Sequence, residues 1–344
     1  MKYVVTGGAG FIGSHLTEKL VEQGDQVTVI DNLNTGKEKN LKHVREKIEF
    51  VKGDILDEKL IDEITRNING VFHEAALASV QDSFVKPKEY HDVNVKGSEN
   101  IFQLAKELGF KVVYASSSSV YGNPIKIPIK EESEKNPINP YAQTKLDDEN
   151  LAKKYTNEDV SIIGLRYFNV FGERQSKSYA GVIKLFLERI QKHDPPIING
   201  DGSQIRDFVY VKDVVQANIM ALESDVKSAF INIGTGKTVS ILELANQIIK
   251  SSNLELNPIH QDALNGDVME SKADVSLAKK LLKWEYKMEL NDWLENTVSN
   301  LLNFFLDWNQ FFIFLLGNPS IISESTTTLH SILCFSKVLA NPFK

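Results

Sequence analysis

Tyr141 and Lys145 lie four residues apart in the segment PYAQTK, at the expected start of a helix. Side chains at this spacing project from the same face of a helix, one turn apart. An ammonium group beside a phenol stabilises the phenolate, which can then act as a base on a substrate hydroxyl. Because such pairs are also common on solvated helix surfaces, the pair alone does not predict an active site.

A strand-like run that ends in serines precedes this pair. Residues 111–116 read KVVYAS, and the serine run 117–119 follows. The carboxyl ends of strands in a parallel sheet border the ligand crevice, so a hydroxyl there can share a proton with Tyr141 and a substrate. Without that context, a serine run would indicate only a loop. The combination predicts acid–base chemistry at a strand end.

Three glycines separate the first strand-like run, KYVVT, from the amphipathic run SHLTEKLVEQG: Gly7, Gly10 and Gly13. Glycines at this spacing permit a tight turn, close approach of backbone N–H groups to a pyrophosphate, and close packing of a helix on a sheet. The helix N-terminus then faces the phosphates. Glycines also mark ordinary loops, but their place between a strand and a helix predicts a dinucleotide site.

Asp31 ends the second strand-like run, eighteen residues after Gly13. An acidic side chain there can accept hydrogen bonds from ribose hydroxyls and repels a 2′-phosphate, which favours NAD over NADP. The alternative is a turn residue that caps the loop 32–34. Asp54 and Ile55, after the third strand-like run, are expected at the adenine edge.

The first 170 residues alternate strand-like and helical patterns, which implies crossover units and a parallel sheet covered on both faces. The strand-like runs are 2–6, 27–31, 48–51, 70–75, 111–116 and 160–168, and the helical patterns lie near 11–23, 90–108 and 141–156. We therefore expect an α/β protein with a Rossmann-type doubly wound parallel sheet and a smaller C-terminal substrate-binding region. The expected parts are an NAD-binding domain (1–170), a nucleotide-sugar-binding region (171–298) and an atypical tail (299–344).

Later patterns indicate a strand at 205–211, helices at 212–223, 240–252 and 275–283, and an extended closing segment at 284–290.

Composition excludes several classes of protein. The chain has 344 residues, of which 25% are charged and 42% apolar, which argues against a disulfide-stapled mini-protein and against global disorder. A formal charge of −7 opposes attraction to nucleic acid. A single cysteine, Cys334, and seven scattered histidines predict no metal site, and His73 is interpreted as a hydrogen-bonded structural residue. The N-terminus lacks a secretory pattern, so a cytoplasmic location is expected.

The ordered motifs extend far beyond these sites. The chain resembles the extended short-chain dehydrogenase/reductase superfamily and, within it, NAD-dependent nucleotide-sugar 4-epimerases of the UDP-glucose/UDP-N-acetylglucosamine type. The resemblance covers roughly residues 1–298 and rests on TGGAGFIGSHL (6–16), DNL (31–33), GDI (53–55), HEAALASV (73–80), NVKGSENI (94–101), ASSSSVYG (115–122), PYAQTK (140–145), LRYFNVFGERQ (165–175), INGDGSQIRDFVYVKDVVQAN (198–218), NIGTG (232–236) and GDVMESKAD (266–274).

This resemblance implies a role for each matching residue. Tyr141 is the implied acid/base, Ser117 its hydroxyl partner with Ser118 as a second candidate, and Lys145 binds the nicotinamide ribose and tunes Tyr141. The implied NAD contacts are Gly7, Gly10, Phe11, Ile12, Gly13, Asp31, Asn32, Asp54, Ile55, Ala75, Ala76, Asn94, Tyr141, Lys145 and Phe168. The implied contacts to the UDP portion are Asn169, Ile197, Asn199, Gly200 and Arg206. The alternative for Arg206 is a surface ion pair with Asp207 or Asp213. A homodimer is also implied.

The implied reaction is C4 epimerisation of a UDP-sugar through a transient 4-keto intermediate. Relatives that dehydrate or decarboxylate the sugar usually carry an acidic residue in the stretch 117–119, where this chain has only serines. Ser271 occupies the position of the family's size gate, and a serine leaves room for an acetamido group. UDP-GlcNAc/UDP-GalNAc and UDP-Glc/UDP-Gal are therefore the expected substrates. A UDP-glucuronate 4-epimerase, a dehydratase and a noncatalytic NAD or nucleotide-sugar binding protein remain as alternatives.

Two segments depart from the family pattern. The family usually has an arginine for the diphosphate just before Gly266, where this chain reads Ala263-Leu264-Asn265. The tail also extends beyond the usual family length. Its segment 301–317 is apolar but shorter than the roughly 20 residues that span a bilayer. We therefore favour a partner-binding helix or sequence outside the intended reading frame over membrane contact.

Overall fold

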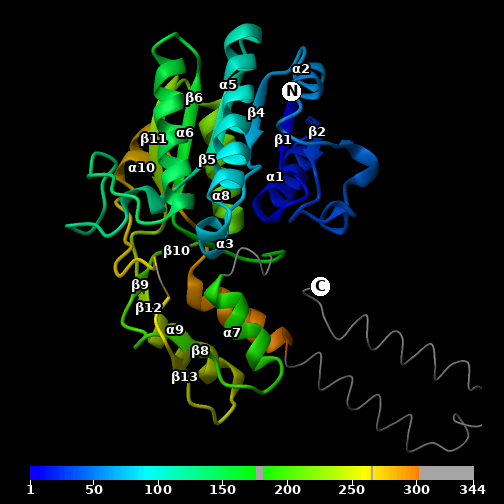
Figure 1. The fold of residues 1–344 in the computed structure, drawn as a ribbon. Helices are drawn as coiled ribbons and strands as arrows, with labels where there is room; N and C mark the ends of the chain where they lie inside the picture. Colours follow the sequence, from blue (N-terminus) through cyan, green and yellow to red (C-terminus); the bar gives the residue numbers. More distant parts are fainter. Residues whose placement is uncertain (176–180, 265, 302–344) are drawn as a thin grey trace, which may run out of the picture.

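A seven-stranded parallel sheet forms the centre of the molecule in the computed structural model, which describes residues 1–175, 181–264 and 266–301 (Figure 1). The strand order is β11-β6-β5-β4-β1-β2-β3, and every neighbouring pair is parallel. The strands are β1 (Lys2–Thr6), β2 (Gln26–Asp31), β3 (Glu49–Lys52), β4 (Gly70–His73), β5 (Lys111–Ser117), β6 (Ile162–Tyr167) and β11 (Ser228–Ile233). This order confirms the predicted Rossmann-type fold.

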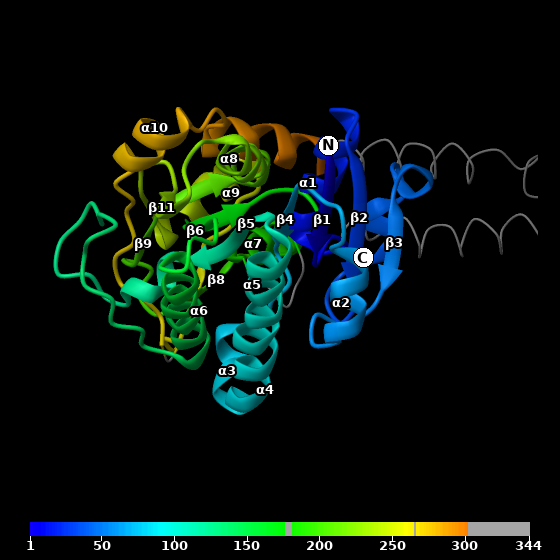
Figure 2. The ribbon, with the colours of Figure 1, turned by 90° about the horizontal axis from the view of Figure 1, so that it is seen from above.

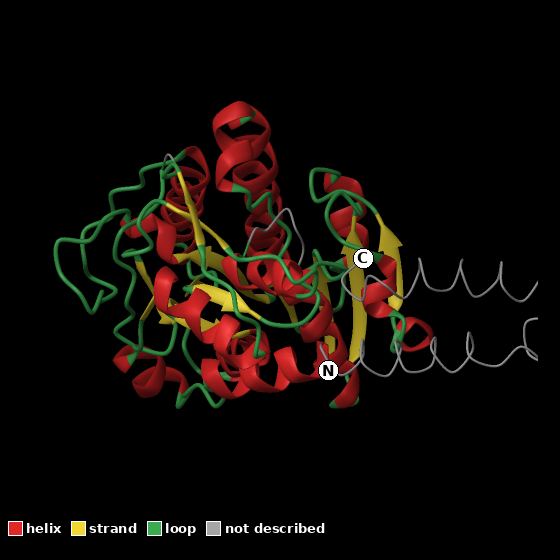
Figure 3. Ribbon diagram, turned by 90° about the horizontal axis from the view of Figure 1, so that it is seen from below, coloured by secondary structure: helices red, strands yellow, loops and turns green. Residues whose placement is uncertain are grey.

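Alternating side chains give the sheet two apolar faces. In β1, the neighbours Val4 and Val5 are both fully buried but belong to opposite cores, as expected for a period of two. Helices cover both faces in Figures 2 and 3. The core on one side includes residues of α1 (Phe11–Glu22) and α8 (Val211–Glu223). The core on the other side includes residues of α2 (Glu58–Ile64), α5 (Gly97–Leu108) and α6 (Pro140–Thr156).

The seventh strand of the sheet comes from late in the chain. Residues 228–233 form β11, which pairs in parallel with β6 from Ser228 opposite Ile162 to Ile233 opposite Tyr167. The alternating pattern up to residue 170 accounts for six strands, and no strand was predicted at 228–233. The range 171–298 thus supplies an edge strand and α8 to the central sheet besides forming the smaller region.

The smaller region lies below the sheet in Figure 1. It contains α7 (Val182–Ile190), α9 (Ile241–Ser252) and two-stranded pairs of β8 (Ile197–Asn199) with β13 (Ile259–Gln261) and of β9 (Ile205–Arg206) with β12 (Val239–Ser240). A further pair joins β7 (Asn169–Phe171) to β10 (Phe208–Tyr210). The single strand predicted at 205–211 is wrong, because β9 and β10 pair with different strands and α8 begins at Val211. The predicted helices at 212–223, 240–252 and 275–283 correspond to α8, α9 and α10 (Ser276–Leu282).

The helix predicted near 90–108 is interrupted. It begins as α4 (Pro87–His91), continues as a π-helical turn over Asp92–Lys96, and becomes α5. π-helical turns inside longer helices are frequent at functional sites. The remaining helices are α3 (Val80–Val85) and three short 3₁₀ turns over Glu38–Leu41, Arg45–Lys47 and Ser118–Tyr121.

The closing segment, predicted as extended at 284–290, contains no helix or strand from 284 to 289, and a helix begins at residue 290. Trp284 is buried, and its indole Nε1 donates to the carbonyl oxygen of Asp213 at 2.9 Å. Residues 290–301 are helical. Within the described ranges, no helix has the length and apolar character needed to cross a membrane. The tail predictions beyond residue 301 lie outside the described residues.

Candidate active site

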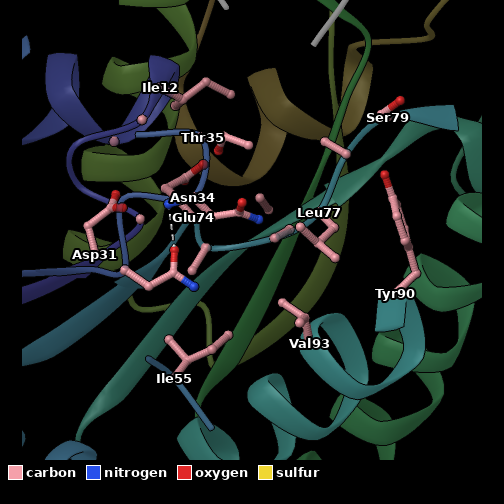
Figure 4. A pocket seen from close by; sticks show the side chains of 18 of the residues that line it. Ile12, Asp31, Asn34, Thr35, Ile55, Glu74, Leu77, Ser79, Tyr90 and Val93 are labelled. Carbon is pink, nitrogen blue, oxygen red and sulfur yellow. Dashed lines mark hydrogen bonds between the residues drawn. The ribbon is translucent and has the colours of Figure 1, made fainter. Parts of the chain in front are cut away.

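A first cavity of about 530 Å³ opens between the glycine turn, the ends of the neighbouring strands and the start of α6. Figure 4 shows Asp31 toward one end of it and Ser79 and Tyr90 toward the other. It is lined by thirteen of the residues predicted to contact NAD: Gly7, Gly10, Phe11, Ile12, Gly13, Asp31, Asn32, Asp54, Ile55, Ala75, Ala76, Tyr141 and Lys145. The structure therefore brings together in space a set that is spread over the first 145 residues.

The glycine turn leaves no room for side chains. Gly7 has a φ of +65°, and a Cβ there would lie 2.8 Å from the backbone of Ala75. A Cβ on Gly13 would lie 2.3 Å from the carbonyl oxygen of Gly7. Gly10, which precedes α1, provides no side-chain cap, and the first residues of the helix, Phe11 to Gly13, line the cavity. This arrangement fits a pyrophosphate at the helix N-terminus.

Two backbone N–H groups contact the carboxylate of Asp31, which lines the cavity. Its carboxylate accepts hydrogen bonds from the N–H groups of Ala9 at 2.9 Å and Leu33 at 2.8 Å. Burial raises the pKa of Asp31, and these two hydrogen bonds act in the opposite direction. The bond to Leu33 is the turn cap considered as an alternative, and it coexists with a position in the cavity wall. A carboxylate oxygen has several acceptor sites, so these bonds leave capacity for ribose hydroxyls.

A second cavity of about 380 Å³ adjoins the first. The predicted residues that line it are Ser117, Ser118, Tyr141, Phe168, Asn169, Ile197, Asn199, Arg206 and Ser271. Five residues line both cavities: Ala78, Ser79, Ser117, Tyr141 and Tyr167. The hydroxyl-bearing pair Ser117 and Tyr141 therefore lies where the two cavities meet.

Three predicted residues lie elsewhere than expected. Phe168 lines the second cavity and not the first. Asn94 lines neither cavity: its amide bonds both backbone polar groups of Leu77, at 2.8 and 3.0 Å, and donates to Thr144 Oγ1 at 2.9 Å. Gly200 also lines neither cavity and forms a turn after β8 with a φ of +74°. Asn94 thus links Leu77, which lines the first cavity, to Thr144 on α6 without lining the cavity itself.

The first turn of α6 fixes Tyr141. The side chain of Asn139 caps the helix by accepting from the N–H of Ala142 at 2.8 Å, and Pro140 occupies the first helical position. Lys145 follows one turn later and is 4% exposed. Its Nζ lies 3.4 Å from Asp148 Oδ2, a buried contact on the same helix.

A buried ion pair holds α6 against the sheet below the serine run. Arg166 on β6 makes a bidentate contact with Glu149 on α6, with both N–O distances at 2.7 Å. Glu149 also accepts from Ser116 Oγ at 2.8 Å, and Arg166 donates to Tyr121 Oη at 2.6 Å. The segment that carries Ser117 is thereby tied at both ends to the helix that carries Tyr141.

Glu74 and Tyr167 line the first cavity but were not predicted as site residues. Tyr167 Oη donates to Glu74 Oε1 at 2.8 Å and accepts from Asn218 Nδ2 at 2.7 Å. Burial raises the pKa of Glu74 to about 7. The sequence signal for Glu74 was available, because a carboxylate directly after a buried parallel strand lies at the ligand edge of the sheet.

His73 is a structural residue, as predicted. Its ring nitrogens contact Thr6 Oγ1 at 2.7 Å and Ser98 Oγ at 3.1 Å. Complete burial lowers its pKa to about 3, with the charge of Lys145 adding to the effect. Across the described part of the chain, no three His, Cys, Asp or Glu residues are grouped so that they could hold a metal ion.

Arg206 forms neither of the ion pairs considered as alternatives. Its Nη2 donates to Asp267 Oδ1 at 2.5 Å. Asp207 is fully buried, and its carboxylate instead accepts from three backbone N–H groups, those of Thr235, Gly236 and Ala273, at 2.7 to 3.0 Å. Asp213 accepts from backbone N–H groups after Trp284. The guanidinium of Arg206 thus belongs to the wall of the second cavity.

Comparison with known proteins identifies the family. The sequence profile of the NAD dependent epimerase/dehydratase family matches residues 3–234. The chain belongs to this family. NAD is the cofactor of this epimerase/dehydratase family, and the glycine turn and Asp31 give the first cavity the features that a dinucleotide requires.

Relatives of the epimerase/dehydratase are similar over almost their full length. A putative UDP-glucose 4-epimerase of Methanocaldococcus jannaschii is 39% identical over 305 residues, covering 87% of this chain and 98% of the relative. The UDP-glucose 4-epimerase of Thermotoga maritima, solved with UDP-glucose, superposes with a TM-score of 0.84 at 35% identity, covering 89% and 100% of the two chains. The UDP-N-acetylglucosamine 4-epimerase of Methanobrevibacter ruminantium, solved with UDP-N-acetylmuramic acid, gives 0.83 at 37% identity, covering 88% and 98%.

Proposed function

We propose that this chain inverts the configuration at C4 of a UDP-sugar, with UDP-GlcNAc/UDP-GalNAc and UDP-Glc/UDP-Gal as substrates. The observation that carries the proposal is the position of Ser117 and Tyr141 in the walls of both cavities. A sugar held in the second cavity can present its 4-hydroxyl to Tyr141 at the border with the cofactor cavity. The proposed roles of the other residues follow from which cavity each one lines.

Tyr141 is the proposed acid and base. Its phenolate takes the proton from the 4-hydroxyl and later returns a proton to the 4-keto oxygen, while Ser117 hydrogen-bonds the same oxygen. NAD held by the glycine turn and Asp31 in the first cavity would supply the hydride acceptor and donor for C4. Lys145, one turn after Tyr141, favours the phenolate by its positive charge. The UDP portion stays anchored while the keto sugar turns.

The proposed anchor for UDP lies in the smaller region. Ile197, Asn199 and Arg206 line the second cavity together with Asn169. Arg206 offers a fork of N–H donors that suits a diphosphate. Ser271 is 7% exposed and lines the same cavity, so it supports acceptance of a sugar with a 2-acetamido group.

The test is NMR of the purified chain with UDP-GlcNAc, UDP-glucose and UDP-glucuronate in separate reactions. No NAD is added at first. We expect the C4 epimer of UDP-GlcNAc or UDP-glucose to form, which shows epimerisation with retained cofactor. Conversion of UDP-glucuronate alone would favour the glucuronate 4-epimerase alternative. No conversion after NAD is supplied would contradict the proposal and favour a dehydratase or a binding protein.

A further inference from the structure

Asp148 is a carboxyl buried directly behind the proposed active site. It lies on α6, three residues after Lys145, and is fully buried. Its Oδ2 contacts Lys145 Nζ at 3.4 Å, whereas its Oδ1 has no hydrogen-bond partner among the residues that the structure describes. A buried carboxylate oxygen without a partner is costly in free energy. Such a group therefore calls for a functional explanation.

The neighbouring helix position shows what a purely structural carboxyl looks like. Glu149, next in the chain, is equally buried, and both of its oxygens bond the Arg166 guanidinium. Asp148 has no comparable partner. Its 3.4 Å contact with Lys145 is long for a charge-assisted hydrogen bond. Asp148 therefore lies close enough to interact electrostatically with Lys145, but the contact does not fully compensate its charge.

Several titratable groups face this carboxyl from the elements around it. They are Lys145 and Asp147 on α6 and Tyr114 on β5, whereas His73 and Glu74, near the end of β4, act on the same Lys145. The hydroxyl of Ser98, on α5, lowers the pKa of Asp148, and it donates its proton to the carbonyl oxygen of Asn94 at 2.6 Å. Burial raises the pKa of Asp148 to about 7, with Lys145 and Ser98 opposing the rise. The charge of Asp148 therefore changes at near-neutral pH.

We propose that Asp148 is a positioning residue that acts through Lys145 on the acid–base group Tyr141. When Asp148 is neutral, the ammonium of Lys145 acts on Tyr141 with its full charge. When Asp148 is ionised, its negative charge offsets the positive charge of Lys145 and draws the ammonium toward Asp148 and away from Tyr141. The proposal rests on the proposed function of Tyr141 and Lys145. It adds the ionisation of Asp148 to the groups that control how Tyr141 activity depends on pH.

The test is an ultraviolet titration of the cofactor-loaded full chain. The signal of the Tyr141 phenolate is the difference between each protein and the same protein carrying Tyr141→Phe. Asp148→Asn keeps an oxygen that can accept from Lys145 but removes the negative charge. We expect it to move phenolate formation to lower pH, by up to about 1 pH unit. Asp62→Asn is the matched control, because it makes the same change on α2, in an exposed pair with Arg66, and it should not move the titration.

A second variant approaches the same carboxyl from α5. Ser98→Ala removes a hydroxyl that lowers the pKa of Asp148, so it should shift the phenolate signal in the same direction as Asp148→Asn. This variant keeps the test decisive if Asp148→Asn does not fold. Asp148→Ala, which also removes the acceptor for Lys145, should lower kcat more than Asp148→Asn, with a smaller change in KM.

Two results would overturn the proposal. One is a phenolate titration that is unchanged in both Asp148→Asn and Ser98→Ala. The other is a shift in Glu74→Gln with none in Asp148→Asn, which would assign control to Glu74. The titration needs no turnover. A shift in Asp148→Asn without conversion of any UDP-sugar would therefore support the positioning role while contradicting the proposed reaction.

Discussion

Arg206 and Asp267 form a 2.5 Å ion pair between β9 and the segment after Gly266. Arg206 is largely buried, whereas the Asp267 side chain is 40% exposed. Both residues line the second cavity. The pair therefore holds the guanidinium at the wall of the proposed diphosphate site, where an incoming anion competes with Asp267 for its donors.

Arg206→Ala should weaken binding of the UDP-sugar. A charge-assisted hydrogen bond contributes about 1.5–3 kcal/mol, so we expect KM to rise by roughly 10- to 150-fold, with a smaller change in kcat. Initial rates at varied UDP-sugar concentration measure this change. Arg66→Ala, which removes an exposed pair with Asp62, is the control and should leave KM unchanged. An unchanged KM in Arg206→Ala would remove Arg206 from the proposed diphosphate site.

Leu264→Arg should strengthen the same site. Leu264 lines the second cavity and is 45% exposed, so an arginine there can reach solvent and the cavity without being buried. Adding one charge-assisted contact is expected to lower KM for UDP-sugars by about tenfold. Isothermal titration with UDP alone gives an independent measurement. If UDP affinity does not increase, this position does not face the diphosphate.

Ser271→Tyr should change the choice of sugar. Ser271 is 7% exposed in the second cavity, and a tyrosine fills the space that a 2-acetamido group needs. We expect turnover of UDP-GlcNAc to fall at least about tenfold relative to that of UDP-glucose, because a steric clash of this size is worth more than 1.4 kcal/mol. NMR competition with both sugars in one tube measures the ratio directly. Equal losses for both sugars would contradict the size-gate interpretation.

Tyr141→Phe should separate catalysis from binding. Loss of the phenol removes the proposed acid and base, for which a loss of at least 100-fold in kcat is about the expected size. Binding of NAD and UDP-sugar should survive. Tyr155→Phe, whose hydroxyl bonds Gln103 on α5, is the matched control. Full activity in Tyr141→Phe would exclude this residue as the acid and base, and would weaken the proposed mechanism.

Glu74 should make folding stability depend on pH. Its pKa rises from 4.5 to about 7 in the folded chain because of burial. Below pH about 4.5 the carboxyl is protonated in both states. Between about 4.5 and 7 the unfolded chain alone ionises, so the free energy of unfolding falls as pH rises. Relative to Glu74→Gln, the native chain should lose about 3 kcal/mol between pH 4 and 8.

Urea denaturation of both proteins across this pH range measures the difference. The glutamine can still accept a hydrogen bond from Tyr167, so the comparison isolates the charge. A constant difference between the two unfolding free energies at all pH values would show that Glu74 ionises normally. The same measurements repeated with NAD present show whether the raised pKa of Glu74 persists when the cofactor is bound.

Local patterns were enough to predict most of the central sheet. The first six strands and the helices α1, α6, α8 and α9 fall close to the predicted ranges. The strand β11 was missed because its single short run, SAFINI, lies after the strict alternation has ended. The π-helical turn at Asp92–Lys96 was also missed, since a change from four- to five-residue hydrogen bonding leaves no clear trace in side-chain periodicity.

The alternation of strand-like and helical patterns and the spacing of the three glycines could be read from the sequence alone. The glycine turn depends on residues close in the chain, because Gly7 and Gly13 approach each other across one turn. The spacing of Tyr141 and Lys145 is likewise a local property of one helix. Local spacing therefore identifies the candidate chemical groups.

The groups that surround them in space come from distant parts of the chain and are set by its packing. The pairing of Arg206 with Asp267, the bond from Tyr167 to Glu74, and the meeting of two cavities at Ser117 and Tyr141 join segments far apart in the chain. The unpartnered oxygen of Asp148 is likewise visible only after packing. Burial and electrostatic environment depend on what the folded chain brings within a few ångströms, and a one-dimensional pattern does not contain that information.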